Sequence, residues 1–73
     1  MTLLDEVRAR QLPSAKTRRA IRLAANVSQM RMAAELDVHR TTFIRWENGT
    51  QEPRGTNRER YARLLVDLQQ VSS

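Results

Sequence analysis

Apolar residues recur three or four positions apart along most of this chain, and no run alternates apolar and polar residues for long enough to predict a strand. Such spacing places side chains on one face of a helix. The sequence therefore predicts an all-α fold, a compact bundle of about five short helices. The expected apolar faces are Leu3, Leu4 and Val7; Ile21, Ala24 and Ala25; Met32, Ala33 and Leu36; Phe43 and Trp46; and Tyr61, Leu64, Leu65, Leu68 and Val71.

Residues that cap or stop helices set the expected ends of these segments. Thr2 and Asp5 have the spacing of a capping box, and Pro13 ends the first helix, which is expected over residues 3–11. The second helix is expected to end near Asn26, the third to span 29–36 and the fourth 39–47, with a loop over 50–56. The expected N-caps of the second, third and last helices are Ser14, Ser28 and Asn57.

The chain is short, basic and free of cysteine. Its 73 residues suit one small domain, and without cysteine a disulfide framework or a thiolate metal site is excluded. Thirteen lysines and arginines against eight acidic residues give a net charge of +5, which favours an anionic partner. We expect no metal, no cofactor and no enzymatic activity, because the single histidine, His39, has no cluster of ligands or catalytic partners around it in the sequence.

Charged residues interrupt the apolar stretch near the N-terminus. They are Asp5, Glu6, Arg8 and Arg10, and they exclude a signal peptide. The sequence contains no run of about 18 apolar residues, the length that would predict a membrane span. A cytoplasmic location is therefore expected.

The expected helix over 39–47 has two chemically different faces. At about 100° per residue, Phe43 and Trp46 fall on the packing side, with Thr42 and Glu47 at its flanks. The other side mixes arginine, threonine and an aliphatic residue. Arginine can bond guanine, threonine can bond other base edges, and the aliphatic side chain can contact a thymine methyl group. An ordinary solvated face is the alternative interpretation. The residues of this second side are Arg40, Thr41, Ile44, Arg45 and Asn48.

The helix over 29–36, a short turn and the helix over 39–47 form a helix-turn-helix. The sequence around them resembles the lambda-repressor and Cro-like (XRE-type) family over roughly residues 14–68. The resemblance implies a DNA-binding domain over about 14–70, with an N-terminal helix in 1–13 outside the family pattern and a polar tail at 71–73. The matching segments are Ile21-Arg22, Val27-Ser28-Gln29, Ala33, Leu36-Asp37-Val38 and Arg45-Trp46-Glu47-Asn48-Gly49.

The resemblance also implies roles for individual residues. Base contacts are implied for Arg40, Thr41, Ile44 and Arg45. Phosphate contacts are implied for Gln29 and Asn48, and a structural ion pair for Arg22 with Glu47. By position and charge, His39, Arg54 and Arg58 are further candidates for phosphate, with solvated surface charges as the alternative.

Two departures from the family pattern fall in turns. The family usually has Gly where this chain has Asn26 and Asp37, and both residue types tolerate positive φ. The loop after Gly49 is about three residues longer than is common in the family.

These observations predict a sequence-specific regulator of transcription, most simply a small phage-type repressor in the nucleoid. A single small domain buries too little DNA surface to find one genomic site, so a homodimer on a palindromic operator is expected. The alternatives are a protein-binding adaptor or antitoxin-like domain with the same fold, and an architectural factor in recombination or excision.

Overall fold

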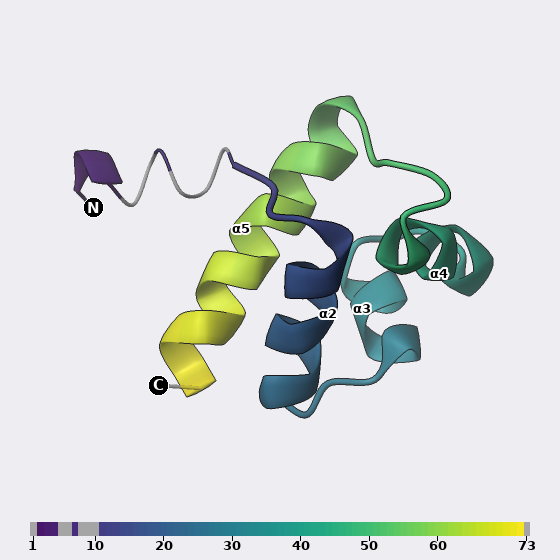
Figure 1. Ribbon diagram of the computed structural model, residues 1–73, viewed down its shortest axis with the longest axis horizontal. Coiled ribbons are helices and arrows are strands. Elements are labelled where there is room, and N and C mark those ends of the chain that lie inside the picture. Colours follow the sequence, from purple (N-terminus) through teal and green to yellow (C-terminus); the bar gives the residue numbers. More distant parts are fainter. Residues whose placement is uncertain (1, 5–6, 8–10, 73) are drawn as a thin grey trace.

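The computed structural model describes residues 2–4, 7 and 11–72, and these residues contain helices and no strand. Four helices are complete within them: α2 (Ala15–Ala24), α3 (Gln29–Glu35), α4 (Arg40–Asn48) and α5 (Gly55–Ser72) (Figure 1). The expected all-α class is confirmed, with four complete helices where about five were expected. The predicted bounds of the second, third and fourth helices agree with α2, α3 and α4 to within about two residues.

The described residues before Gln11 contribute little to the core. Leu3, Leu4 and Val7 have helical backbone, but their side chains are 76%, 57% and 38% exposed. Gln11 lies outside any helix, so the first helix does not extend as far as expected. The expected capping box between Thr2 and Asp5 includes a residue outside those described.

Helices α2, α3 and α4 all end in the same motif. A residue with positive φ follows each helix: Asn26 at 59°, Asp37 at 53° and Gly49 at 78°. The amide of each donates to the carbonyl three residues earlier, and the next amide donates to the carbonyl five residues earlier. These are Schellman motifs, in which the left-handed residue satisfies carbonyls that have no partner inside the helix. The expectation that Asn26 and Asp37 replace glycine in turns is confirmed.

The starts of the helices agree with the predicted caps except at the last helix. The Oγ atoms of Ser14 and Ser28 accept hydrogen bonds from amides three residues later, at 3.3 and 3.0 Å. The prediction that Asn57 caps the last helix is wrong, because α5 begins at Gly55. The carbonyl of Arg54 accepts the bond from the amide of Arg58 at 3.4 Å, so the start of α5 lies within the expected loop.

The core lies between α3, α4 and the middle of α5. Its buried hydrophobic members are Met32, Ala33, Leu36, Phe43, Trp46, Tyr61, Ala62 and Leu65, and partly buried Leu12, Ile21, Val27, Val38, Leu64 and Leu68 pack around this cluster. Besides Leu3, Leu4 and Val7, three expected members are absent from it: Ala24 is exposed, Ala25 is half-buried but not part of the cluster, and Val71 is 86% exposed. In place of an apolar face, α2 buries Arg18 and Arg22.

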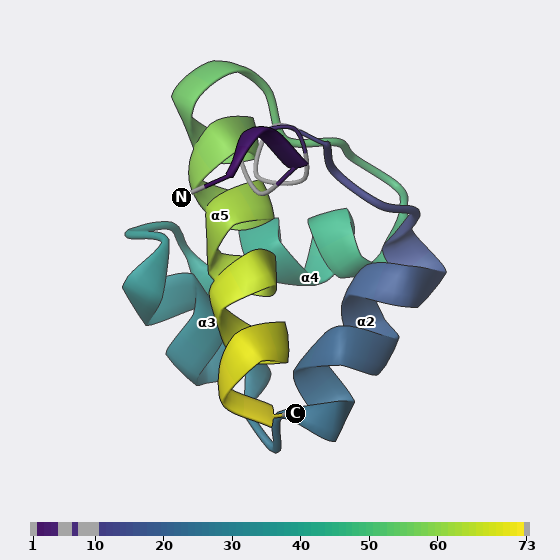
Figure 2. The ribbon, with the colours of Figure 1, turned by 90° about the vertical axis from the view of Figure 1, so that its left-hand side faces the viewer.

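Helix α4 packs against α2 and α3, and α2 also packs against α5. Among the four labelled helices of Figure 2, α5 lies nearest the viewer, α2 and α3 lie on either side of it, and α4 lies behind. The outer side of α4 therefore faces away from α5. Among the described residues, no helix combines the length and apolar character needed to cross a membrane.

Candidate nucleic-acid interface

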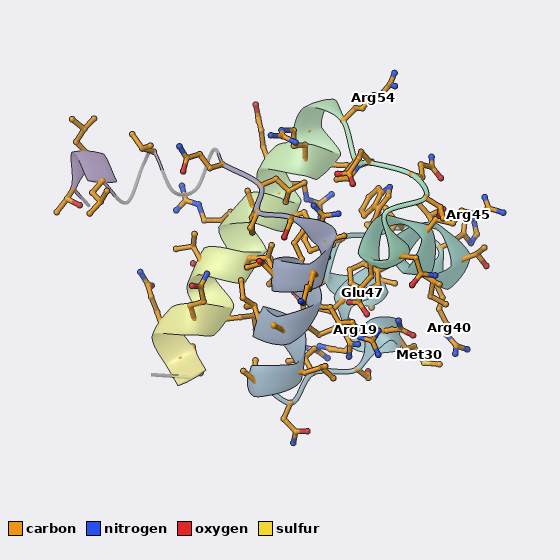
Figure 3. All side chains as sticks on the ribbon, in the orientation of Figure 1. Arg19, Met30, Arg40, Arg45, Glu47 and Arg54 are labelled. Atoms are coloured by element: carbon orange, nitrogen blue, oxygen red, sulfur yellow. The ribbon has the colours of Figure 1, made fainter. Side chains whose placement is uncertain are left out.

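Helix α4 has its buried aromatic side chains on one side and exposed polar side chains on the other, as its sequence predicts. Phe43 is 0% and Trp46 3% exposed, and their rings lie 5.5 and 5.9 Å from that of Tyr61 on α5. On the opposite side, Ile44 is half-buried and the other side chains are exposed: Arg40, Thr41, Arg45 and Asn48. In Figure 3, Arg45 projects from α4 away from the other helices, and Arg40 projects below α4, in the direction of Met30 on α3. The aromatic anchors thus hold a polar face toward solvent.

A buried ion pair joins α2 to the far end of α4. The Nε of Arg22 donates to Oε2 of Glu47 at 2.7 Å, and Nη2 donates to Oε1 at 2.8 Å. The remaining Nη1 of Arg22 donates to the carbonyl of Val27 at 2.8 Å, in the turn before α3. The ion pair implied by the resemblance is therefore present and bidentate. It ties α2 to α4 and to the start of the helix-turn-helix.

Hydrogen bonds favour the charged forms of both residues in this pair. Burial would raise the pKa of Glu47, but hydrogen bonds from Arg22 and Gln29, with the positive charges of Arg22 and Arg19, together lower it below its usual value. The hydrogen bond to Glu47 correspondingly raises the pKa of Arg22. Because Glu47 is ionised and compensated at neutral pH, it gives the outer side of α4 little negative character.

Gln29 has a different environment from the one expected of a residue that only contacts phosphate. It is half-buried at the first position of α3, and its Nε2 donates to Oε1 of Glu47 at 3.0 Å. The amide therefore links α3 to the Arg22–Glu47 pair. A contact between Gln29 and phosphate stays a prediction.

The other phosphate candidates are exposed and come from three places. His39 is the N-cap residue of α4 and makes no side-chain cap hydrogen bond, and Asn48 is the last residue of the same helix. Arg54 ends the loop that follows α4, and Arg58 lies in the first turn of α5. In Figure 3, Arg54 projects from a different part of the molecule than Arg40 and Arg45. The candidates thus span the two ends of α4 and the start of α5.

Sequence reasoning missed Arg18, which is only 2% exposed. Its guanidinium lies 5.5 Å from the centroid of the Tyr61 ring, a distance typical of a cation–π contact. One signal could have identified it: Arg18 and Arg22 are four residues apart, so a helix that buries one of them tends to bury the other.

Two further observations bear on the chemistry of the chain. Among the described residues, no group of three or more His, Cys, Asp or Glu side chains could hold a metal ion. The polar side of α4 instead offers hydrogen-bond donors and positive charge, which suit an anionic, grooved surface.

Comparison with known protein families matches residues 19–70 to a helix-turn-helix family. No curated protein and no solved structure matches the chain. The matched range includes α3, the turn and α4, together with most of α2 and α5. The chain therefore belongs to the lambda-repressor and Cro-like helix-turn-helix family of DNA-binding regulators.

Proposed function

We propose that this protein binds double-stranded DNA in a sequence-specific manner and regulates transcription, with α4 in the major groove. The observation that carries this proposal is the polar side of α4. It presents Arg40, Thr41 and Arg45 to solvent on a helix whose other side is fixed by Phe43 and Trp46. A helix held rigidly in this way presents its side chains in one register, as base recognition requires.

Each exposed side chain has a suitable partner in the major groove. Arg40 and Arg45 can each donate two hydrogen bonds to the O6 and N7 atoms of guanine, and Thr41 can donate to or accept from a base edge. Half-buried Ile44 can meet a thymine methyl group. This division makes the two arginines the main determinants of base preference.

Contacts with the DNA backbone would orient α4 without adding sequence preference. His39 and Asn48 flank the helix at its two ends, where they are exposed. Arg54 and Arg58 add positive charge at the start of α5, and Gln29 retains its carbonyl oxygen and one amide hydrogen beyond the bond to Glu47. These residues would set the salt dependence of binding.

The assembly that fits this function is a homodimer on a palindromic operator. A single domain of this kind buries roughly 600 to 1,000 Å² on DNA, which is low for selecting one site in a genome. Two copies would place their recognition helices about one helical turn apart. Within this proposal the protein acts as a small repressor of the phage type, located in the cytoplasm with the nucleoid.

Selection of binding sites from random duplex DNA tests the proposal. An enriched inverted repeat is the expected result. Enrichment of a single half-site would contradict the proposed dimer but not sequence-specific DNA binding. Binding without sequence enrichment would favour an architectural role, and absence of duplex binding would favour a protein-binding adaptor or antitoxin-like domain.

Alanine substitution tests the role of the two arginines. Arg40→Ala and Arg45→Ala should each reduce discrimination between the selected site and random duplex by about 1 to 3 kcal/mol. Arg63→Ala is the matched control, because Arg63 is an exposed arginine of α5 and its loss changes the net charge equally. If all three variants discriminate between the selected site and random duplex equally well, the assignment of base contacts to Arg40 and Arg45 is overturned.

A further inference from the structure

Arg18 is a buried cation whose hydrogen-bond partners come from separate parts of the chain. Its Nη1 donates to the carbonyl of Pro13 at 2.6 Å, and its Nη2 donates to the carbonyl of Trp46 at 2.8 Å and to Oε1 of Glu52 at 3.2 Å. A buried charge is costly unless it is paired and hydrogen-bonded, so this set of partners is what allows Arg18 to be buried.

Two of these partners lie on either side of the turn that ends α4. The carbonyl of Trp46 is in the last turn of the helix, where carbonyls lack partners within the helix and positive charge is favourable. Glu52 is in the loop that follows, and its side chain is 53% exposed. Arg18 therefore connects α2 with the end of α4 and with the loop.

The loop is tethered at successive residues. The amides of Thr50 and Gln51 both donate to the carbonyl of Arg45, at 3.0 and 3.3 Å, and the Thr50 hydroxyl donates to the same carbonyl at 3.2 Å. Glu52 bonds Arg18, and Pro53 is buried. Arg54 follows directly and is exposed. Among the described residues, the bond from Arg18 to Glu52 is thus the last side-chain hydrogen bond of the loop before Arg54.

We infer that Arg18 is a positioning residue for the loop over 49–54, which it fixes so that Arg54 and the start of α5 face the DNA backbone. Arg54 is the group that touches phosphate in this scheme, and Arg18 acts only through the loop. The inference rests on the proposed function for the role of Arg54. Its structural half, the fixing of the loop by Arg18, is independent of DNA.

Packing alone does not require an arginine at this position. Replacing Arg18 leaves no buried charge behind, because the side chain of its ion-pair partner Glu52 is 53% exposed. A methionine at position 18 would keep an unbranched side chain against Tyr61 but would lose the bonds to the Trp46 carbonyl and to Glu52. A guanidinium at position 18 can therefore link α2 to the loop, and a methionine side chain cannot.

Hydrogen exchange tests the structural half of the inference. In Glu52→Ala and Arg18→Met, the amides of Thr50 and Gln51 should exchange about tenfold faster, while the amides of α2 keep their protection. Glu35→Ala is the matched control for Glu52→Ala. Glu35 is another carboxylate paired with an arginine, its side chain is 47% exposed, and its loss changes the net charge equally. Unchanged exchange at Thr50 and Gln51 in Glu52→Ala would overturn the inference, even if Arg18→Met fails to fold.

A double-mutant cycle tests the link to DNA. In the wild-type background, Arg54→Ala should make the slope of log K against log salt shallower by about 0.9 for each bound copy, so by about 1.8 for the proposed dimer. The same substitution should have no further effect on the slope in Arg18→Met or Glu52→Ala, because the contact is already lost there. Glu35→Ala should retain the full effect of Arg54→Ala.

The outcomes separate the two proposals. If Arg54→Ala changes the slope equally in all backgrounds, Arg18 does not act through Arg54 and the inference is overturned. If Arg54→Ala has no effect in the wild type, the assigned phosphate contact fails, and with it the DNA-facing half of the inference. The exchange of the loop amides still decides whether Arg18 fixes the loop.

Discussion

Tyr61 is a buried titratable residue whose surroundings differ from those of a free side chain. It is 0% exposed, and the rings of Phe43 and Trp46 and the guanidinium of Arg18 lie around it. Burial raises the pKa of its phenol to about 12, although the nearby charge of Arg18 opposes the shift. The neutral phenol is therefore the form that the fold favours.

This shift predicts a loss of stability in alkali. Because the folded pKa lies above the unfolded value of about 10, the contribution of Tyr61 is fully present below about pH 10 and is lost as the pH rises through about 12. Tyr61 is the only tyrosine, so tyrosinate absorbance reports it alone. The expected midpoint is about 12 in the folded protein and about 10 in urea.

The Tyr61→Phe variant is the control for this titration. It should show no tyrosinate signal, and its free energy of unfolding should fall less between pH 10 and 12. A midpoint near 10 while circular dichroism still shows native helix content would contradict the burial of the phenol.

At the scale of elements, the end of α4 determines where the recognition helix stops and the loop begins. Gly49 has φ of 78°, and a Cβ added there would lie 3.6 Å from the Cβ of Ala15, which is an ordinary contact. Space is therefore available, and the backbone conformation is the constraint. The same conformation is adopted by Asn26 and Asp37, which tolerate it better than most residues with a side chain.

Substitution of Gly49 separates backbone strain from packing. Gly49→Ala should lower the free energy of unfolding by about 1 to 2 kcal/mol, because alanine is strained at positive φ. Asn26→Gly relieves the same strain at the end of α2 and should be neutral or slightly stabilising. Urea denaturation measures both. Equal stability of Gly49→Ala and the wild type would argue against the left-handed cap.

At the scale of the whole molecule, the packed body begins before α2. Leu12 packs against the core cluster, and the carbonyl of Pro13 accepts a hydrogen bond from Arg18. In contrast, Leu3, Leu4 and Val7 are exposed. Among the described residues, contacts with the packed body therefore begin at Leu12, and we expect the N-terminal boundary that matters for stability to lie near Gln11. The domain bounds expected from the resemblance, 14 and 70, stay a prediction.

Two truncations test this boundary. Deletion of residues 1–10 should change the free energy of unfolding by less than about 0.5 kcal/mol, the usual range for surface changes. Deletion of residues 1–13 should cost about 1 to 3 kcal/mol, because it removes the Leu12 contact and one partner of a buried guanidinium. Thermal denaturation of both truncated proteins makes the comparison. If both truncations lower the free energy of unfolding by the same amount, the boundary does not lie near Gln11.

Much of the fold could be predicted because its determinants are local. Ser14 and Ser28 cap helices through atoms three residues away, and Asn26 and Asp37 turn the chain through their own φ angles. The two sides of α4 follow from its helical period, so the exposure of Arg40 and Arg45 and the burial of Phe43 and Trp46 could be predicted from the sequence.

The start of α5 could not be predicted from local preferences. Asn57 is a good cap by residue type, yet the helix begins two residues earlier, after a loop tied to α4 and α2. Gln29 likewise has the expected position, but its amide bonds Glu47, which is 18 residues away. In both cases the deciding partner is distant in the sequence.

Local signals along the chain specify the helical class, the caps of α2 and α3, the turns after α2 and α3, the polar side of α4 and the family. Each depends on residues within a few positions of one another or on the order of such signals. Contacts between distant parts of the folded chain explain why α2 buries two arginines rather than alanines and why Arg18 bonds the Trp46 carbonyl and Glu52, 28 and 34 residues away. The physical reason is that an arginine can be buried only where its charge and donors find partners, and the folded chain alone brings those partners together.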